Sequence, residues 1–177
     1  MKTNYFLYIK LLCLFSFAGL LSCGSNKQIH TNSETQPVSC PENGICTFEL
    51  LQNKRLEIKN DAFGKTYYSL EDDTTKNTIR YIYNLKNDKN IQDSSYREEV
   101  VFEFNASETE LNLLDTKLQD SKMLFGRFCF CRGATGYYKV KEGNLKLKKI
   151  NETYQLDFDF KINEVPQIVS KISGVVK

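Results

Sequence analysis

Strict alternation of apolar and polar residues is the dominant pattern of this chain. Over residues 154–162, tyrosine, leucine, phenylalanine and isoleucine occupy every second position, and polar residues occupy the positions between them. A period of two places apolar side chains on one face of an extended strand and polar side chains on the other. Shorter segments at 46–50, 79–83, 100–104 and 145–147 have the same period. The pattern predicts a succession of half-buried β-strands.

Turn-forming residues separate these segments at spacings of roughly ten residues. Clusters of turn-forming residues, mainly asparagine, aspartate and glycine, lie at 53–54, 61–64, 72–77, 133–136, 142–143 and 151–153. Short alternating strands with such turns between them are typical of an antiparallel sandwich or barrel. We therefore predict an all-β domain of about nine to eleven short strands, of which a calycin-like arrangement is one form. The expected strands cover residues 46–52, 55–60, 66–71, 78–85, 97–104, 110–114, 122–131, 136–140, 144–150, 154–162 and 167–176.

Two of these segments also fit a short helix. Ser107 and Glu110 have the spacing of a capping box, and leucines at 111, 114 and 118 follow a helical period. Pro166 could open a helix over 167–173, although the β-branched residues there favour a closing strand. We expect at most one or two short helices.

The N-terminal residues follow a different pattern. Lys2 and Lys10 precede an apolar run over residues 11–21. A basic start, an apolar run of about 7 to 15 residues and a small residue before the cleavage point describe a secretory signal peptide. The run is about half of the ~20 residues that a membrane-spanning helix needs. We predict a signal peptide over residues 1–22.

The residues Leu20-Leu21-Ser22-Cys23-Gly24 resemble the lipobox of bacterial lipoproteins. In that family the cysteine thiol is linked to diacylglycerol, and the signal is cut before the cysteine. The resemblance implies that Cys23 is the first mature residue and the membrane anchor, in the bacterial cell envelope and at the outer membrane, on either face. An ordinary secreted protein with an incidental Cys23 is the alternative. The polar residues 23–39 then form a flexible tether, and residues 40–177 form one β domain.

The charge balance argues against a nucleic-acid partner. Residues 1–22 contain two lysines and no acidic residue, so the remaining chain has 22 basic and 22 acidic side chains. A neutral domain without a dense basic stripe lacks the electrostatic footprint of a nucleic-acid-binding protein. The expected partners are the membrane, through the lipid on Cys23, and an unidentified protein or small ligand.

Four cysteines remain for the folded domain, at Cys40, Cys46, Cys129 and Cys131. An even number in an exported, oxidising setting indicates two disulfides. Same-face neighbours on a strand lie near the upper Cα separation for bridging each other. We therefore expect both bridges to join residues 40–46 to the strand at 122–131. A four-thiolate zinc site is the rival interpretation, although structural zinc sites usually have shorter ligand spacings.

Catalytic motifs are absent from the sequence of the predicted domain. His30, the one histidine of the chain, lies in the tether. The domain therefore lacks the imidazole that a serine or cysteine triad or an HExxH zinc hydrolase requires. Carboxylate-pair chemistry on sugars stays open, because the fold and not local spacing sets such pairs. We expect a protein that is not an enzyme and that needs no cofactor or metal.

The segment 123–139 carries the most distinctive residues. It is apolar on both faces up to Cys131, as in a strand that is covered on both sides. Arg127 and Arg132 could stabilise a thiolate, so a redox pair at the C-x-C sequence is an alternative to crosslinking. The candidate binding surface surrounds the turn that follows, because arginine and tyrosine on a rigid turn suit recognition. It consists of Arg132, Tyr137, Tyr138 and Lys139. An ordinary β-sheet surface is the competing interpretation.

The sequences CPENGIC, SYREEVVFEF and MLFGRFCFCRGATGYY resemble a group of Bacteroidota lipoproteins of unknown function. This resemblance implies export and anchoring, and no catalytic activity. The turn at 134–138 also resembles, loosely, that of lipoprotein lysozyme inhibitors, which are small β-barrels. We expect an envelope-anchored binding module. The alternatives are an inhibitor of an enzyme such as a lysozyme or protease, and a thiol redox or four-cysteine metal protein.

Replacing the lipobox cysteine tests the anchor. We expect Cys23→Ala to block cleavage by the lipoprotein signal peptidase and to abolish labelling with radioactive fatty acid, because the acceptor thiol is gone. Cys13→Ala, a change inside the signal run, is the matched control and should label like the wild type. Unchanged labelling of Cys23→Ala would contradict the lipoprotein interpretation.

Overall fold

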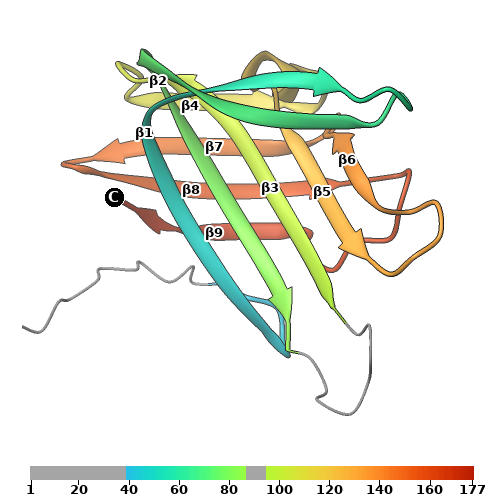
Figure 1. Ribbon diagram of the computed structural model, residues 1–177. Helices are drawn as coiled ribbons and strands as arrows, with labels where there is room; N and C mark the ends of the chain where they lie inside the picture. The colour runs from blue at the N-terminus through green and yellow to red at the C-terminus, as the bar shows by residue number, and fades with distance from the viewer. Residues whose placement is uncertain (1–38, 87–94) are drawn as a thin grey trace, which may run out of the picture. The chain divides into compact units, whose positions relative to one another are not determined.

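The computed structural model describes residues 39–86 and 95–177, in which nine strands form two antiparallel sheets. Figure 1 shows the four-stranded sheet behind the five-stranded sheet. The five-stranded sheet has the order β1 (Gly44–Asn60), β2 (Thr66–Leu85), β3 (Tyr96–Asn105), β5 (Leu124–Cys129) and β6 (Gly136–Lys139). The four-stranded sheet has the order β4 (Glu110–Leu114), β7 (Glu142–Ile150), β8 (Thr153–Lys161) and β9 (Lys171–Val176). The predicted all-β class is confirmed, as a two-sheet sandwich.

Predictions about the N-terminal segment lie outside the described residues. These are the signal peptide over 1–22, lipidated Cys23, His30 and the tether up to residue 38. Within the described ranges, no helix is both long enough and apolar enough to cross a membrane.

The first two strands are longer than predicted, because the expected turns at 53–54 and 72–77 are irregularities within a continuous hairpin. The β1–β2 register shifts between Gln52 and Lys54, and Asn53 has a positive φ of 56°. The Asn53 N–H donates to the Asn77 side-chain oxygen at 3.1 Å. Both flanks of this bulge stay paired, so the hairpin bends without reversing direction.

The bend carries the outer half of the hairpin across the outer face of the five-stranded sheet (Figure 1). Leu56 of β1 packs there against Val101 of β3 and Leu124 of β5, and all three are buried. The Glu103 carboxylate of β3 accepts a hydrogen bond from the Leu56 N–H at 2.6 Å and pairs with Lys122 at 3.0 Å. The central strand β3 is therefore covered on both faces.

Neither of the two segments that also fit a short helix forms an α-helix in the described residues. Residues 110–114 form β4, and a short 3-10 helix follows at Asp115–Ser121, where Leu118 is fully buried. The closing strand begins only at Lys171, because Gln167 organises a loop before it. The side-chain oxygen of Gln167 accepts from the Ile162 N–H, and its amide donates to the carbonyl of Val169.

The core lies between the two sheets. Even-numbered residues of β3 and β8 face each other across it, and ring contacts such as Phe104–Tyr154, with centroids 5.1 Å apart, join the sheets. Phe125 of β5 contacts Phe160 of β8 in the same way, at 5.8 Å. The alternating pattern at 154–162 therefore encodes the inner face of the sandwich.

One end of this core is polar. Glu98 of β3 points inward and is almost fully buried, 1% exposed. Its two carboxylate oxygens accept hydrogen bonds from the N–H groups of Ile168 and Val169, each at 2.7 Å, in the loop before β9. The Tyr96 hydroxyl donates to the same carboxylate. Glu98 thus joins the two sheets with charge-assisted hydrogen bonds.

The predicted disulfides between residues 40–46 and the strand at 122–131 are wrong. The sulfur pairs at bonding distance are Cys40–Cys46 and Cys129–Cys131, with Cα separations of 5.9 Å and 5.1 Å. The sheet order explains the difference, because β2 and β3 lie between β1 and β5 and hold them about 14 Å apart. The chain also leaves the strand after Cys129, which brings its Cα within bridging range of that of Cys131.

The chain enters the described domain along the edge of the four-stranded sheet. The Ser39 hydroxyl accepts a hydrogen bond from the Ser173 N–H of β9 at 3.2 Å. The adjacent Cys40 is bonded to Cys46 of β1. This entry segment therefore contacts one edge strand of each sheet.

Removing the Glu98 carboxylate, which joins the two sheets, should lower the stability of the fold. We expect Glu98→Ala to lower the free energy of unfolding by about 3 kcal/mol, because the buried N–H of Val169 and the partly buried N–H of Ile168 lose their acceptor. Glu98→Gln, which retains one acceptor oxygen, should cost less. Urea denaturation measures both. The exposed turn variant Glu152→Ala is the control and should stay within about 0.5 kcal/mol. A Glu98→Ala effect no larger than the control would refute this role.

Candidate functional site

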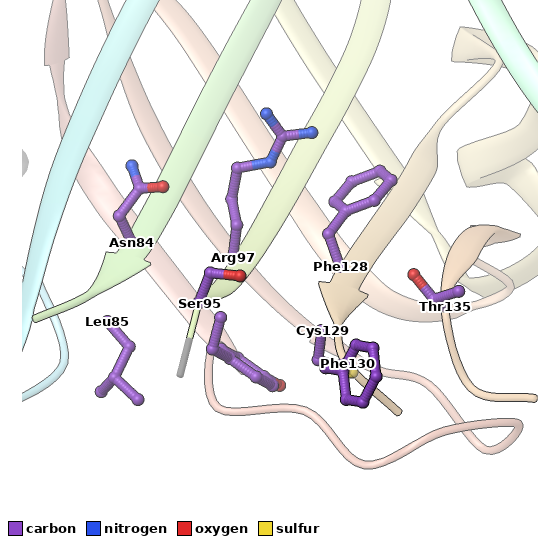
Figure 2. A pocket seen from close by; sticks show the side chains of 9 residues that line it. Asn84, Leu85, Ser95, Arg97, Phe128, Cys129, Phe130 and Thr135 are labelled. Atoms are coloured by element: carbon purple, nitrogen blue, oxygen red, sulfur yellow. The ribbon is translucent and has the colours of Figure 1, made fainter. Parts of the chain in front are cut away.

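An open groove of about 510 Å³ lies at one end of the five-stranded sheet (Figure 2). The sheet is incomplete here, because β2 ends at Leu85, β3 begins at Tyr96 and β5 ends at Cys129. The strand ends and the turn after β5 form the walls. The lining residues are Asn84, Leu85, Ser95, Tyr96, Arg97, Phe128, Cys129, Phe130 and Thr135.

Arg97 is the one charged side chain among the described residues that line the groove. Its guanidinium carbon lies 4.3 Å from the centroid of the Phe128 ring, which is a cation–π contact between neighbouring strands. The nearest carboxylate oxygen, on Glu99, is 3.7 Å from a guanidinium nitrogen, beyond hydrogen-bond distance. The buried Nε has no acceptor in the part of the chain that the structure describes. Because the Arg97 side chain is nevertheless 41% exposed, its terminal guanidinium nitrogens are the donors that a ligand in the groove can reach.

A ladder of aromatic rings holds Phe128 in place. The Phe128 ring meets Tyr137 of β6 edge-on at 5.1 Å, and Tyr137 meets Tyr68 of β2 at 5.3 Å. Gly126 permits this close stacking, because a Cβ there would lie 2.6 Å from a Tyr137 ring carbon. The Tyr68 hydroxyl donates to Glu99, the neighbour of Arg97. Arg97 is thus positioned by a continuous set of contacts on the outer face of the sheet.

The opposite wall is fixed from inside the sandwich. Arg127, 8% exposed, donates to the Ala134 carbonyl at 2.8 Å and to the Tyr96 hydroxyl at 3.3 Å. The Thr135 hydroxyl donates back to the Arg127 carbonyl at 3.1 Å. These bonds hold the turn between β5 and β6 beside the end of β5, so both walls of the groove are rigidly supported.

The structure separates the four residues of the predicted binding surface. Tyr137 lies on the outer face of β6 and supports Phe128, while Tyr138 faces the core between the sheets. Arg132 is exposed in the preceding turn, and Lys139 is exposed at the end of β6. The two tyrosines are half-buried and point to opposite faces, so the four side chains do not form one surface.

Arg97 and Phe128 were not singled out by the sequence. They are neighbours only because β3 pairs with β5, with Arg97 opposite Phe128 in the register. The apolar character of residues 123–131 on both faces was the available signal, because an arginine beside such a strand needs an aromatic or acidic partner.

The zinc interpretation does not fit this arrangement of cysteines. Cys46 lies opposite Tyr83, Tyr83 opposite Glu98 and Glu98 opposite Arg127, so two strands separate the two cysteine pairs. Four sulfurs on one zinc ion must each lie about 2.3 Å from it. In the described ranges, no group of three or more histidine, cysteine, aspartate or glutamate side chains is placed to hold a metal.

A second hollow of about 230 Å³ lies on the outer face of the four-stranded sheet. Glu110, Lys146, Lys148 and Asp157 line it, so both signs of charge are present. It has no aromatic wall, and we regard it as a solvated sheet surface that serves as a comparison for the groove.

Burial raises the pKa of several tyrosines around the site. It raises that of Tyr68 to about 12, together with the hydrogen bond to Glu99. The pKa of Tyr96 is raised to about 12 by burial and by the hydrogen bond to Glu98. Burial, with Glu99 nearby, raises the pKa of Tyr137 further. These phenols are neutral donors at physiological pH.

No family model, curated protein or solved structure matches this chain.

Because these phenols are buried, alkaline pH should destabilise the fold. A folded-state pKa above the unfolded value of 10.0 gives stability that is complete below pH 10 and is lost as the pH rises to about 12. We expect the melting temperature to fall steeply over this range, with tyrosinate absorbance appearing mainly on unfolding. Tyr68→Phe should flatten the fall, and Tyr67→Phe, on an exposed neighbour, is the matched control. Ionisation of Tyr68 and Tyr96 near pH 10 in the folded protein would contradict their raised pKa values.

Proposed function

We propose that this protein binds a small anionic ligand with an apolar, flat body in the groove at the end of the five-stranded sheet. The observation that carries the proposal is the pairing of Arg97 with Phe128 on one wall of a 510 Å³ groove. Ligand pockets are typically about 300–1,000 Å³ in volume, mostly apolar, with a few placed polar groups. The groove has this composition.

The charge of Arg97 selects the polar part of the ligand. A guanidinium presents a planar fork of N–H donors that matches a carboxylate, sulfonate or phosphate. Glu99 contacts one side of the guanidinium only at 3.7 Å, so it restrains the side chain without occupying its donors. Asn84 and Thr135 offer further hydrogen-bonding groups along the groove.

The apolar walls select the body of the ligand. The ring of Phe128 is half-buried, and the ring of Phe130, at the end of the groove, is 85% exposed. Covering an exposed phenylalanine with a ligand removes apolar surface from water, which is favourable by about 25 cal/mol per Å². A flat ring or acyl chain attached to an anionic group fits both walls.

Preorganisation supports a binding role over a purely structural one. The aromatic ladder and the Arg127 hydrogen bonds fix the walls before any ligand arrives. Ordering of side chains on association costs about 0.5–1.5 kcal/mol per flexible side chain, and a fixed site avoids most of that cost. With the lipid anchor expected at Cys23, such a ligand would belong to the cell envelope.

Anilinonaphthalene sulfonate is a suitable probe, since it combines a flat aromatic body with one fixed negative charge. We expect it to fluoresce on binding to the wild type, and Arg97→Ala to weaken its affinity about tenfold, the effect of losing one charge-assisted hydrogen bond. Arg97→Lys should recover only part of the loss, because lysine lacks the planar fork. Phe128→Leu should weaken binding as well.

Two controls sharpen this test. Lys146→Ala removes a cation from the second hollow and should leave the affinity unchanged. Uncharged phenylnaphthylamine should bind the wild type and Arg97→Ala equally. Because the sulfonate probe also binds partly unfolded protein, each variant must first show a cooperative thermal transition. Equal affinity of the sulfonate probe for folded wild type and folded Arg97→Ala would refute the proposal.

A further inference from the structure

We propose that the Cys129–Cys131 pair is a thiol–disulfide exchange site that oxidises dithiol substrates. The inference goes beyond ligand binding at the groove and does not depend on it. It rests on where the pair lies, on how little the fold depends on it, and on the charges beside it.

The pair lies where a substrate can reach it. Cys129 is the last residue of β5 and lines the groove, and both cysteines are half-buried. Phe130, the single residue between them, is 85% exposed. An attacking thiolate needs access to one sulfur, and the open groove gives access on the Cys129 side.

The pair crosslinks nothing beyond its own turn. It closes a loop with one intervening residue, and the entropic stabilisation by a disulfide falls as its loop shortens. Two hydrogen bonds also stabilise the turn after β5: Arg127 donates to the Ala134 carbonyl, and the Thr135 hydroxyl donates to the Arg127 carbonyl. Cys40–Cys46, in contrast, ties the entry segment to β1. The fold can therefore tolerate opening of Cys129–Cys131.

Two arginines, Arg127 and Arg132, lie beside the pair in the sequence. Arg127 is two residues before Cys129, and its guanidinium is bonded to Ala134, whose N–H donates to the Cys131 carbonyl at 3.4 Å. Arg132 follows Cys131 and is exposed. The buried Glu98 lies opposite Arg127 in the register. Its carboxylate accepts hydrogen bonds from the Tyr96 hydroxyl and from the N–H groups of Ile168 and Val169. Positive charge near a cysteine stabilises its thiolate.

The exchange is balanced in two steps. A substrate thiolate attacks Cys129 Sγ, an S–S bond forms to the substrate, and the Cys129–Cys131 bond breaks with Cys131 leaving as a thiolate. The second substrate thiolate then attacks the substrate sulfur of this mixed disulfide and releases the Cys129 thiolate. The substrate loses two electrons and becomes a disulfide, while the protein gains them as a dithiol. A low-molecular-weight disulfide of the glutathione type returns the protein to its oxidised form.

The first experiment compares the two cysteine pairs of the full chain in glutathione buffers of increasing reducing power. After alkylation and peptide mass mapping, we expect Cys129–Cys131 to be reduced while Cys40–Cys46 is still oxidised. Joint reduction of both pairs, or a Cys129–Cys131 pair that is the more resistant of the two, would overturn the proposal.

The second experiment uses a synthetic peptide with two cysteines as substrate. The wild type should oxidise one equivalent of peptide, and Cys129→Ser/Cys131→Ser should lose this reaction with little change in melting temperature. Cys131→Ser alone, with an oxidant and a variant peptide that has a single cysteine, should accumulate a mixed disulfide between Cys129 and that peptide, because neither partner then has a second thiol to resolve it. Cys40→Ser/Cys46→Ser is the matched control and should oxidise the peptide normally.

Two outcomes contradict the proposal directly. Peptide oxidation by Cys129→Ser/Cys131→Ser at the wild-type rate would place the activity elsewhere. Unfolding of that variant would show that the pair is a structural crosslink. Neither outcome bears on the binding of the anionic probe by the wild type, because that binding involves no electron transfer.

Discussion

The buried carboxylates of the central strand are the constraint on which both layers of this protein depend. A carboxylate removed from water must be met by donors, or the fold loses several kcal/mol. On the inner face of β3, Glu98 meets the N–H groups of the loop before β9. On its outer face, Glu103 meets the N–H of Leu56 and the ammonium of Lys122. One strand thereby positions the second sheet and the folded-over hairpin.

The same network reaches the groove from both faces of the sheet. Tyr96, which lines the groove, donates to Glu98, and the Tyr68 hydroxyl on the outer face donates to Glu99. On that outer face, the Arg97 guanidinium also makes a cation–π contact with the Phe128 ring. The groove is the end of a closely connected sheet, so its walls are positioned in part by residues that do not line it, such as Tyr68 and Glu99. This is the condition under which few contacts can give specific binding.

The alternation of apolar and polar residues made the strands predictable from the sequence. The pairing register between strands, which brings the residues of the groove together, could not be predicted from it. The expected strand at 154–162 is β8 (Thr153–Lys161), and the one at 110–114 is β4, because a period of two reports a half-buried strand without knowledge of its partners. Arg97 and Phe128 are far apart in sequence and meet only through the β3–β5 pairing. The predicted disulfide pairing was wrong for the same reason. No local sequence pattern indicates that β2 and β3 lie between β1 and β5 in the sheet.

The contact of Ser39 with β9 has a consequence for how copies of this domain behave near one another. An unpaired edge strand is a template for the addition of another chain, and natural sheets cover or interrupt such edges. The Ser173 N–H, which would otherwise be open on that edge, is taken by the Ser39 hydroxyl. The Cys40–Cys46 bond keeps this segment close to the domain. A second molecule that pairs with β9 at Ser173 must displace Ser39, which the adjacent disulfide holds close to the domain, so the entry segment disfavours edge-to-edge pairing at this position.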